Sequence, residues 1–430
     1  MDSEQIVTNL VDAGYDVVAE HEEAGVVVVN TCGFIDSAKA ESFAAIEQAL
    51  ALGREVVVTG CLGAKRDELL ARFPTLRHIS GPADVAPVMQ AVQSYAPSPG
   101  GRATPERGLR PRERLTPAHY AYLKISEGCN HTCSFCIIPD MRGKLRSRGI
   151  GDVLTEAEAL VAAGAKELLV IAQDLSAYGL DLRYASETVG GRELATRLST
   201  LCTELGDIAP WVRLHYVYPY PSVDELIPLM SQGKILPYLD VPLQHASPRI
   251  LKAMRRPAAA EKTLERIHRW REICPEIAIR STFIVGFPGE TEEDVGALLD
   301  FLESAQLDRV GCFTYSAVAG AKANALPGAV DERDKLDRQE MVYELQAVIS
   351  ARRLDRHVGQ DLRVLIDQAG PECVGRSMFD APEIDGVVRI SDTADIACDV
   401  VTGEFAWVHI EGHDDHDLYG HLIGKNVSLR

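Results

Sequence analysis

The sequence has no apolar run long enough to span a membrane, and no signal peptide opens it. Ten cysteines in 430 residues are too few for a disulfide framework in a chain of this length. Basic residues are also scarce: 44 Lys and Arg stand against 63 Asp and Glu, and the formal net charge is −19. These shortages argue against a membrane protein, a disulfide-built domain and a general nucleic-acid binder. We expect a cytoplasmic protein whose thiols stay reduced and whose acidic surface suits a basic partner.

The chain is long enough for two to four domains. Residues 1–93 predict an α/β domain, because apolar strands over 26–30 and 56–60 flank a helix over 38–52. Strands that are apolar on both faces are typical of a parallel sheet covered by helices on each side. We therefore expect a doubly wound domain at this end of the chain.

Each of these two strands runs directly into a cysteine, Cys32 after the first and Cys61 after the second. In open α/β sheets, binding sites form beyond the carboxyl ends of the strands, so both side chains could face one crevice. The pair is compatible with a shared metal site and equally with two unrelated cysteines.

The middle of the chain predicts a linker followed by a partial (β/α)6 barrel. Residues 94–118 are Pro/Gly-rich and then carry five arginines, a composition that cannot bury a core. Residues 119–350 alternate strands with helices, and in such barrels the chemistry sits on loops that follow the strands. The expected strands span 121–126, 167–173, 211–218, 238–244, 278–287 and 309–317.

The last domain is expected over 351–430, entered through a charged helix over 332–357. Short strands then alternate with turns and predict a small antiparallel β-barrel. They are expected over 362–367, 386–390, 396–401 and 405–410. Residues 358–430 carry 14 Asp and Glu against 5 Lys and Arg. Their net charge of −9 is about half of the net charge of the whole chain, −19.

The densest group of cysteines is Cys129, Cys133 and Cys136, spaced CxxxCxxC with Phe135 before the last. Three thiolates from one loop suit a 4Fe-4S cluster that keeps one iron open, whereas such clusters otherwise favour four thiolates. A zinc site usually shows paired CxxC or CxxC…HxxxH and four ligands, and no fourth cysteine is near. Zinc and simple packing are the alternatives. The cysteines without partner spacing are expected to be buried small side chains: Cys202, Cys274, Cys312, Cys373 and Cys398.

The three segments together resemble the methylthiotransferases of the radical SAM superfamily, which join a cluster-binding domain, a radical SAM partial barrel and a C-terminal TRAM barrel. The resemblance covers essentially the whole chain. It is carried by YLKISEGCN (122–130), CIIP (136–139), RGKLRSR (142–148), PLQH (242–245) and IVGFPGET (284–291). Two further stretches, AQDLSAYG (172–179) and DAPEIDG (380–386), look most like the subfamily that modifies small-subunit ribosomal protein twelve.

This resemblance implies two 4Fe-4S clusters and S-adenosylmethionine (SAM). Cys129, Cys133 and Cys136 would hold the first cluster, whose open iron binds SAM. Cys32 and Cys61 match the second and third of three cysteines that hold the second cluster. The implied reaction begins with one-electron cleavage of SAM to a 5′-deoxyadenosyl radical, which removes a hydrogen from the β-carbon of an aspartate. A methylthio group assembled at the second cluster then joins that carbon, with a second SAM as methyl donor.

The first of those three cysteines normally lies in a GCPKN stretch ahead of the residues that match 2–4, and this chain begins at Met1 without it. Residues 2–13 already predict a helix with one apolar face. A missing first strand would leave a hole beside apolar strands and unpaired backbone groups. We hypothesise that the protein starts further upstream and that Met1 marks a late start. The alternative is a real truncation with an incomplete second cluster.

Four residues are expected to contact SAM: Phe135, Gln173, Gln244 and Gly286. The aromatic ring would lie beside the adenine, the glutamines end the second and fourth barrel strands, and the glycine lets the backbone approach the ligand. Each has an ordinary alternative, which is loop packing, a satisfied core polar group or a simple connecting turn. Asp174 and His245, the neighbours of the glutamines, are candidates on the same grounds. The sequence indicates no further catalytic residue.

The main rival is the subfamily with the same chemistry that modifies an adenosine in tRNA. A tRNA binder should present basic surface, whereas the last domain is acidic and better matched to a basic ribosomal protein. We therefore expect ribosomal protein twelve as partner, free or on the subunit, together with an electron donor and a sulfur donor. A cluster-carrying scaffold or electron-transfer protein is the non-enzymatic alternative, but it would need no barrel.

Overall fold

The structure, a computed structural model, describes residues 1–98, 113–256, 260–391 and 400–424. The chain forms two compact units. The first unit comprises 1–115, 127–146 and 316–324, and the second comprises 116–126, 147–315 and 325–430. The loop with three cysteines therefore groups with the amino-terminal residues.

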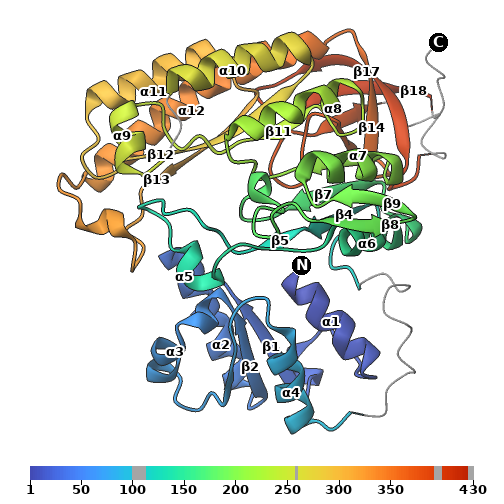
Figure 1. Cartoon of the computed structure of the whole chain (residues 1–430), viewed down its shortest axis with the longest axis vertical. Coiled ribbons are helices and arrows are strands. Elements are labelled where there is room, and N and C mark those ends of the chain that lie inside the picture. Colours follow the sequence, from blue (N-terminus) through green and yellow to red (C-terminus); the bar gives the residue numbers. More distant parts are fainter. Residues whose placement is uncertain (99–112, 257–259, 392–399, 425–430) are drawn as a thin grey trace. The chain divides into compact units, whose positions relative to one another are not determined.

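The first unit contains a parallel sheet in the order β1-β2-β3, with helices packed against both of its faces (Figure 1). Ile46 and Leu69 pack with Val58 on one face, while Ile6 and Val88 pack with Val57 on the other. This arrangement confirms the expected doubly wound domain. Its elements are α1 (Asp2–Asp12), β1 (Val26–Thr31), α2 (Asp36–Ala51), β2 (Glu55–Gly60), α3 (Arg66–Arg72), β3 (His78–Ile79), α4 (Val85–Tyr95) and α5 (Ile138–Arg142).

Strand β1 stands at one edge of this sheet, since β2 is its only partner in the part of the chain that the structure describes. A cavity of about 460 Å³ lies beside it. Its walls include Ile6 and Leu10 of α1, Val26 and Val28 of β1, and Val92 of α4.

The second unit is built on six parallel strands in the sequential order β4-β7-β10-β11-β12-β13, which confirms the partial barrel. Apolar side chains alternate along β12, where Ile279, Phe283 and Val285 join the core beneath the helices. The strands are β4 (Tyr120–Lys124), β7 (Glu167–Ile171), β10 (Trp211–Leu214), β11 (Tyr238–Asp240), β12 (Ala278–Val285) and β13 (Arg309–Thr314). Two short strands flank the cysteine loop in the sequence, β5 (Ser126–Glu127) and β6 (Arg146–Ser147).

Helices follow most of these strands, and α10, α11 and α12 lie alongside β12 and β13 (Figure 1). Helix α11 begins directly after Thr291, because Thr291 and Asp294 form a capping box that the sequence itself contains. The helices are α6 (Ile150–Ala162), α7 (Leu198–Ile208), α8 (Ile227–Ser231), α9 (Pro248–Ala253), α10 (Ala260–Ile273), α11 (Glu292–Ala305) and α12 (Glu332–Leu354). Among the described residues, none of the helices combines the length and the apolar character that crossing a membrane requires.

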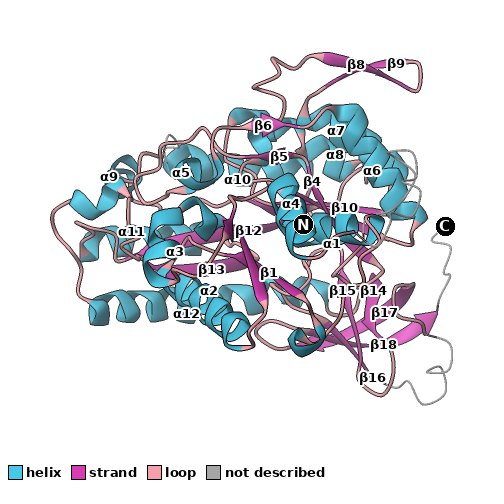
Figure 2. Cartoon of the chain, turned by 90° about the horizontal axis from the view of Figure 1, so that it is seen from below, coloured by secondary structure: helices cyan, strands magenta, loops and turns pink. Residues whose placement is uncertain are grey.

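One hairpin of the second unit is absent from the sequence prediction. Strands β8 (Ser186–Val189) and β9 (Arg192–Ala195) pair antiparallel around Gly190 and Gly191, both of which have positive φ. Figure 2 shows this hairpin extending from the edge of the unit, beside α6 and α7. Its strands carry polar side chains on both faces, so they lack the alternation that predicts a half-buried strand.

The carboxyl-terminal residues form the predicted small barrel, which is closed. One pairing departs from the antiparallel prediction, because β16 and β18 run parallel. Two of its strands, β15 and β18, were also not predicted, and most of the strand expected over 396–401 lies outside the described residues. The strands are β14 (Asp361–Gln368), β15 (Cys373–Ser377), β16 (Val388–Ser391), β17 (Phe405–His413) and β18 (Leu418–Gly424).

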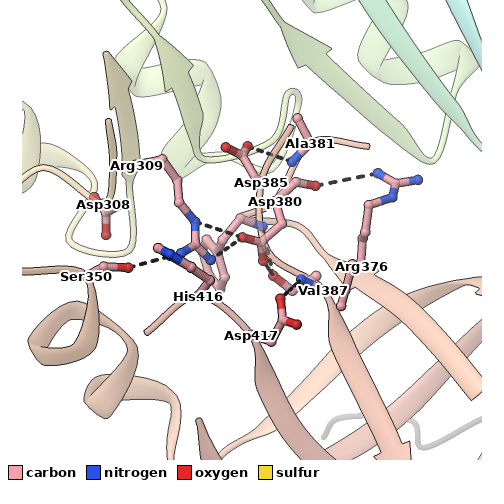
Figure 3. Close-up of polar contacts among 12 residues, drawn as sticks. Asp308, Arg309, Ser350, Arg376, Asp380, Ala381, Asp385, Val387, His416 and Asp417 are labelled. Atoms are coloured by element: carbon pink, nitrogen blue, oxygen red, sulfur yellow. Dashed lines mark hydrogen bonds and ion pairs between the residues drawn. The ribbon is translucent and has the colours of Figure 1, made fainter. Parts of the chain in front are cut away.

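The small barrel packs against the amino-terminal ends of the strands of the large one. Trp211 and Tyr238, which begin β10 and β11, share a buried apolar cluster with Val364 and Val408. Polar contacts also join the two barrels, among them an ion pair of 2.6 Å between Arg309 and Asp380 (Figure 3). The opposite, carboxyl-terminal ends of the strands are those where chemistry is expected.

The cysteines without partner spacing behave as predicted. Cys202, Cys274, Cys312 and Cys373 are buried. Burial raises the pKa of the Cys202 thiol to about 12, so this side chain stays neutral. The prediction for Cys398 concerns a residue outside the described part of the chain.

Candidate functional site

The three clustered cysteines lie on a loop of the first unit, and all three side chains are half-buried. Two of the sulfurs accept hydrogen bonds from the backbone of the same loop. His131 N donates to Cys129 Sγ at 3.4 Å, and Ile138 N donates to Cys136 Sγ at 3.4 Å. Such N–H groups stabilise negative charge on sulfur, as thiolates that bind iron require.

Backbone contacts hold this loop in shape. Cys129 N donates to Gly143 O at 3.1 Å, and Leu145 N donates to the side chain of Asn130 at 3.1 Å. Gly128 has φ +78°, and a Cβ there would lie 2.3 Å from Lys144 O. A glycine is therefore required immediately before the first cysteine, both for its backbone angle and for this close approach.

The donor set fits a cluster better than a single ion. Within the described residues, no three His, Cys, Asp or Glu side chains come close enough together to hold one metal ion. A 4Fe-4S cluster makes a different demand, because each cysteine binds a separate iron at a different corner of a cube. Three half-buried thiols with N–H donors on two of them are compatible with that arrangement.

Cys32 and Cys61 follow paired strands of the same unit, since Thr31 stands opposite Gly60 in the register of β1 and β2. The turns after the strands touch: a Cβ on Gly33 would lie 2.9 Å from the backbone of Leu62. Cys32 is exposed and Cys61 is buried. The two thiols are near enough that the charge of one raises the pKa of the other.

Cys61 also lies against the segment that follows the three clustered cysteines. It shares a buried apolar cluster with Ile137 and Met141. Burial raises the pKa of its thiol, and hydrogen bonding to the Arg142 guanidinium opposes that shift. Arg142 in turn bonds Glu127 at 2.8 Å. The first unit thus brings Cys61 close to the end of the CxxxCxxC loop.

The other expected SAM contacts divide between the two units. Phe135 lies in the first unit and is half-buried. Gln173 and Gln244 lie in the second, shortly beyond β7 and β11, and both are half-buried. Gln244 has φ +74° and extends the sheet by a bridge to Phe283. A left-handed backbone at a non-glycine residue costs energy, and such strained residues recur at functional sites.

The neighbours of these glutamines have structural roles instead. Asp174 is buried and accepts a hydrogen bond from Ser176 N at 2.9 Å, so it caps a short turn. His245 is buried, its Nδ1 accepts from Ser247 N at 2.9 Å, and its Nε2 lies 3.3 Å from Glu290 Oε2. Asp174 and His245 thus each accept one backbone hydrogen bond within the fold, and a contact of either residue with SAM remains a prediction.

Gly286 directly follows β12 with φ +70°, and its N–H donates to Glu290 Oε1 at 2.8 Å. A Cβ at this position would lie 2.2 Å from Lys335 Cγ. The structure thus supplies a packing reason for the glycine, namely the approach of α12. Its contact with SAM remains a prediction.

One residue of the carboxyl-terminal rim was missed by the sequence analysis. Tyr216, just beyond β10, has φ +62° and remains 51% exposed between the buried residues His215 and Val217. Nothing in a run of alternating aromatic and aliphatic residues signals a left-handed tyrosine, because the pattern is that of a buried strand.

Three family models match the chain in the order of its domains. They are the Radical SAM superfamily over residues 123–302, the TRAM domain over 358–423 and the Uncharacterized protein family UPF0004 over 1–81. Together with the six-stranded parallel sheet and the CxxxCxxC loop, they define a radical SAM protein that carries a TRAM domain.

Full-length relatives narrow this class. The chain is 57% identical to the ribosomal protein uS12 methylthiotransferase RimO of Saccharophagus degradans, across 98% of this chain and 88% of the relative. It is 56% identical to RimO of Marinobacter nauticus, with 98% and 92% covered. Among solved structures, the radical S-adenosylmethionine methyltransferase TsrM from Kitasatospora setae aligns with a TM-score of 0.48 at 17% identity, covering 68% of this chain and 65% of that one.

The chain therefore belongs to the RimO family and is a radical SAM methylthiotransferase. The preference for this subfamily over the one that modifies tRNA is confirmed, and so is the preference for an enzyme over a scaffold protein.

Proposed function

We propose that this enzyme adds a methylthio group to the β-carbon of an aspartate side chain in ribosomal protein uS12. Cys129, Cys133 and Cys136 hold one 4Fe-4S cluster, and Cys32 and Cys61 contribute to a second. When bound, the clusters and SAM supply the radical chemistry and the methylthio group. The domains are then a methylthiotransferase domain (1–93), a linker (94–118), a radical SAM core (119–350) and a connecting segment with the TRAM domain (351–430).

The observation that carries this proposal is the packing of Cys61 with Ile137 and Met141 in one compact unit. Two groups of cysteines that are 68 residues or more apart in the sequence belong to the same body. A reaction that needs two clusters for one substrate is best served by ligands on one rigid support, because reacting groups must be held in fixed positions.

The protein's own residues bind and orient the reactants. Phe135, Gln173, Gln244 and the Gly286 turn are the proposed SAM contacts. The Gly286 turn is fixed from behind, since Glu290 accepts its N–H and also pairs with Arg338 at 3.0 Å. Residues so anchored can present backbone groups to a ligand without moving when it binds.

The acidic C-terminal domain favours a basic protein substrate. Glu372, Glu404 and Asp415 are exposed on it, and residues 358–430 carry a net charge of −9. Charge of one sign on the enzyme raises the rate of encounter with a partner of opposite sign. An electron donor and a sulfur donor complete the partners, and tRNA is not expected among them.

Mass spectrometry of uS12 tests the proposal. Cells that lack the gene are complemented with the enzyme or with cysteine variants, and the mass added to the target aspartate is measured. We expect full modification with the wild type, none with Cys133→Ala and none with Cys61→Ala. Cys202→Ala is the matched control, because Cys202 is buried in the apolar core of the second unit, and it should retain modification.

Two results would contradict the proposal. Unmodified uS12 in cells that carry the wild-type enzyme would remove the substrate assignment. Normal modification by Cys61→Ala would show that Cys61 is not a necessary ligand of the second cluster. The assignment of the first cluster to Cys129, Cys133 and Cys136 would be unaffected. Iron and sulfide content of the purified variants separates loss of a cluster from loss of folding.

A further inference from the structure

Tyr216 occupies an unfavourable backbone conformation at the rim of the large barrel. Its φ of +62° lies in the left-handed region, which is rarely adopted by a bulky residue. Residues with positive φ follow three consecutive strands, at Tyr216, Gln244 and Gly286, but only the tyrosine is also half-exposed. Strain of this kind persists only where the surrounding structure enforces it.

The enforcing group is Asp240 at the end of β11, whose side chain is 2% exposed. Its Oδ2 accepts the Tyr216 N–H at 3.2 Å and lies 3.3 Å from His215 Nδ1, while its Oδ1 accepts from Arg280 Nη1 at 3.1 Å. The backbone is fixed from the other side as well, since Leu175 N donates to Tyr216 O at 3.2 Å. Although burial favours a neutral carboxyl, His215 and Arg280 hold the pKa of Asp240 below its ordinary value, so it remains a charged acceptor.

The side chain of Tyr216 lies within electrostatic range of three residues on the face of the sheet opposite the helices. It interacts electrostatically with Tyr122 of β4, Asp240 of β11 and Arg280 of β12. The residues adjacent to these three, Leu123, Leu239 and Ile279, belong to the core under the helices, so the three themselves face the other way. The structure gives the Tyr216 hydroxyl no hydrogen-bond partner among the described residues. Burial, with Asp240, raises the pKa of Tyr216, and the phenol therefore remains a donor at neutral pH.

We propose that Tyr216 contacts the protein substrate and donates a hydrogen bond to the carboxylate of the side chain that is modified. The inference rests on the proposed function, because that function supplies a carboxylate beside the reacting carbon. The four expected SAM contacts follow the first, second, fourth and fifth barrel strands in the chain, whereas Tyr216 follows the third. The Tyr216 hydroxyl is therefore a hydrogen-bond donor that follows a strand without an expected SAM contact, so it is available to the substrate. Fixing the carboxylate orients the adjacent β-carbon.

A double-mutant cycle tests the contact directly. Binding of purified uS12 to the reconstituted holoenzyme is measured with SAM present and reductant absent, so that no turnover occurs. The enzyme is wild type or Tyr216→Phe, and uS12 carries its aspartate or alanine at the target position. Tyr216→Phe should weaken binding of the aspartate form about tenfold or more, as for a hydrogen bond to a charged group. It should leave binding of the alanine form unchanged, because the two groups interact only with each other.

Tyr343→Phe is the matched control, since it removes one hydroxyl from an exposed tyrosine of α12, outside the acidic small barrel. It should bind both forms of uS12 as the wild type does. Unchanged thermal midpoint and iron content of Tyr216→Phe would show that the fold and the clusters are intact.

The outcomes separate this inference from the proposed function. If the wild type modifies uS12 but Tyr216→Phe binds the aspartate form as tightly as the wild type does, the Tyr216 contact is wrong and the function stands. The contact is equally wrong if the variant weakens the binding of both forms of uS12 alike, because the hydroxyl then does not interact with the target aspartate. If the wild type does not modify uS12, the function fails, and the carboxylate contact fails with it.

Discussion

The carboxylate of Glu167 and the guanidinium of Arg376 form an ion pair of 2.6 Å in which neither side chain is more than 2% exposed. Glu167 begins strand β7 of the large barrel, and Arg376 lies on strand β15 of the small one. The second oxygen of Glu167 accepts from Arg213 at 2.7 Å. Although burial favours the neutral form, these two arginines hold the pKa of Glu167 below its ordinary value. The small barrel is therefore joined to the large one through buried charge.

Replacing Glu167 with glutamine should lower the free energy of unfolding of the second unit by about 3–5 kcal/mol, because two buried arginines lose their counter-charge. Urea unfolding followed by circular dichroism measures the change. Glu47→Gln is the matched control, since Glu47 pairs with Arg72 at 2.8 Å while both side chains are half-exposed. That variant should change stability by less than about 1 kcal/mol. Equal effects of the two substitutions would show that the buried pair is not a major source of stability.

His357, just beyond α12, makes stability depend on pH. Its ring is buried and stacks on Phe379 with centroids 4.7 Å apart, and Arg356 Nε donates to its Nε2 at 3.2 Å. Burial, and then the charge of Arg356, lowers the pKa of His357 to about 4, against an ordinary value of 6.5. Between these two pKa values the ring is protonated in the unfolded chain and neutral in the folded protein. The contribution of the neutral His357 to the free energy of unfolding is therefore fully present above pH 6.5 and is lost as pH falls toward 4.

The expected slope is at most about 1.4 kcal/mol per pH unit within that window. His357→Gln should flatten the dependence of the unfolding free energy on pH between 6.5 and 4, relative to the wild type. His409→Gln serves as a control, because His409 is on the surface of the small barrel and pairs with Asp361 at 2.7 Å. A slope that survives in His357→Gln would assign the acid sensitivity to another group.

Two glycines of the second unit should respond oppositely to alanine. Gly286→Ala places a Cβ 2.2 Å from Lys335 Cγ at φ +70°, and we expect a loss of about 2 kcal/mol or more. Gly296 lies within α11, and a Cβ there would meet no neighbouring group within 4 Å, so Gly296→Ala should stabilise by about 0.5–1 kcal/mol. Thermal unfolding of both variants checks the pair. A neutral Gly286→Ala would show that α12 moves aside easily.

The sequence predicts the parts of this fold that depend on local patterns. The βα alternation, the start of α11 at Thr291 and the CxxxCxxC loop are each visible within a short window, because period, capping and spacing are local properties. The strands ended earlier than expected, as β10 does at Leu214. The apolar pattern continues into the rim, where backbone turns and not composition end the strand.

What the sequence could not predict depends on distant partners. Arg376 and Ser377 are buried in β15, and polar residues in a short segment indicate a loop unless their partner is known. That partner, Glu167, is 209 residues away in the sequence. The sequence could not predict the left-handed backbone of Tyr216 for the same reason, since the group that enforces it, Asp240, lies 24 residues further along the chain.

The strain at Tyr216 can be measured apart from its contact with the substrate. Tyr216→Ala and Tyr216→Gly both remove the ring and differ only in the Cβ. At an ordinary position alanine is the more stable of the two by about 0.4–1 kcal/mol, because glycine gives the unfolded chain more freedom. At φ +62° the Cβ of alanine is disfavoured by about 1 kcal/mol or more, so the order should reverse and Tyr216→Gly should unfold at the higher temperature.

Both variants should bind uS12 equally weakly, because both lack the hydroxyl. If Tyr216→Ala is the more stable, the backbone is not strained and Asp240 does not enforce an unfavourable state. If the order reverses while binding is lost in both, the strained backbone lowers stability and the hydroxyl it presents accounts for the affinity.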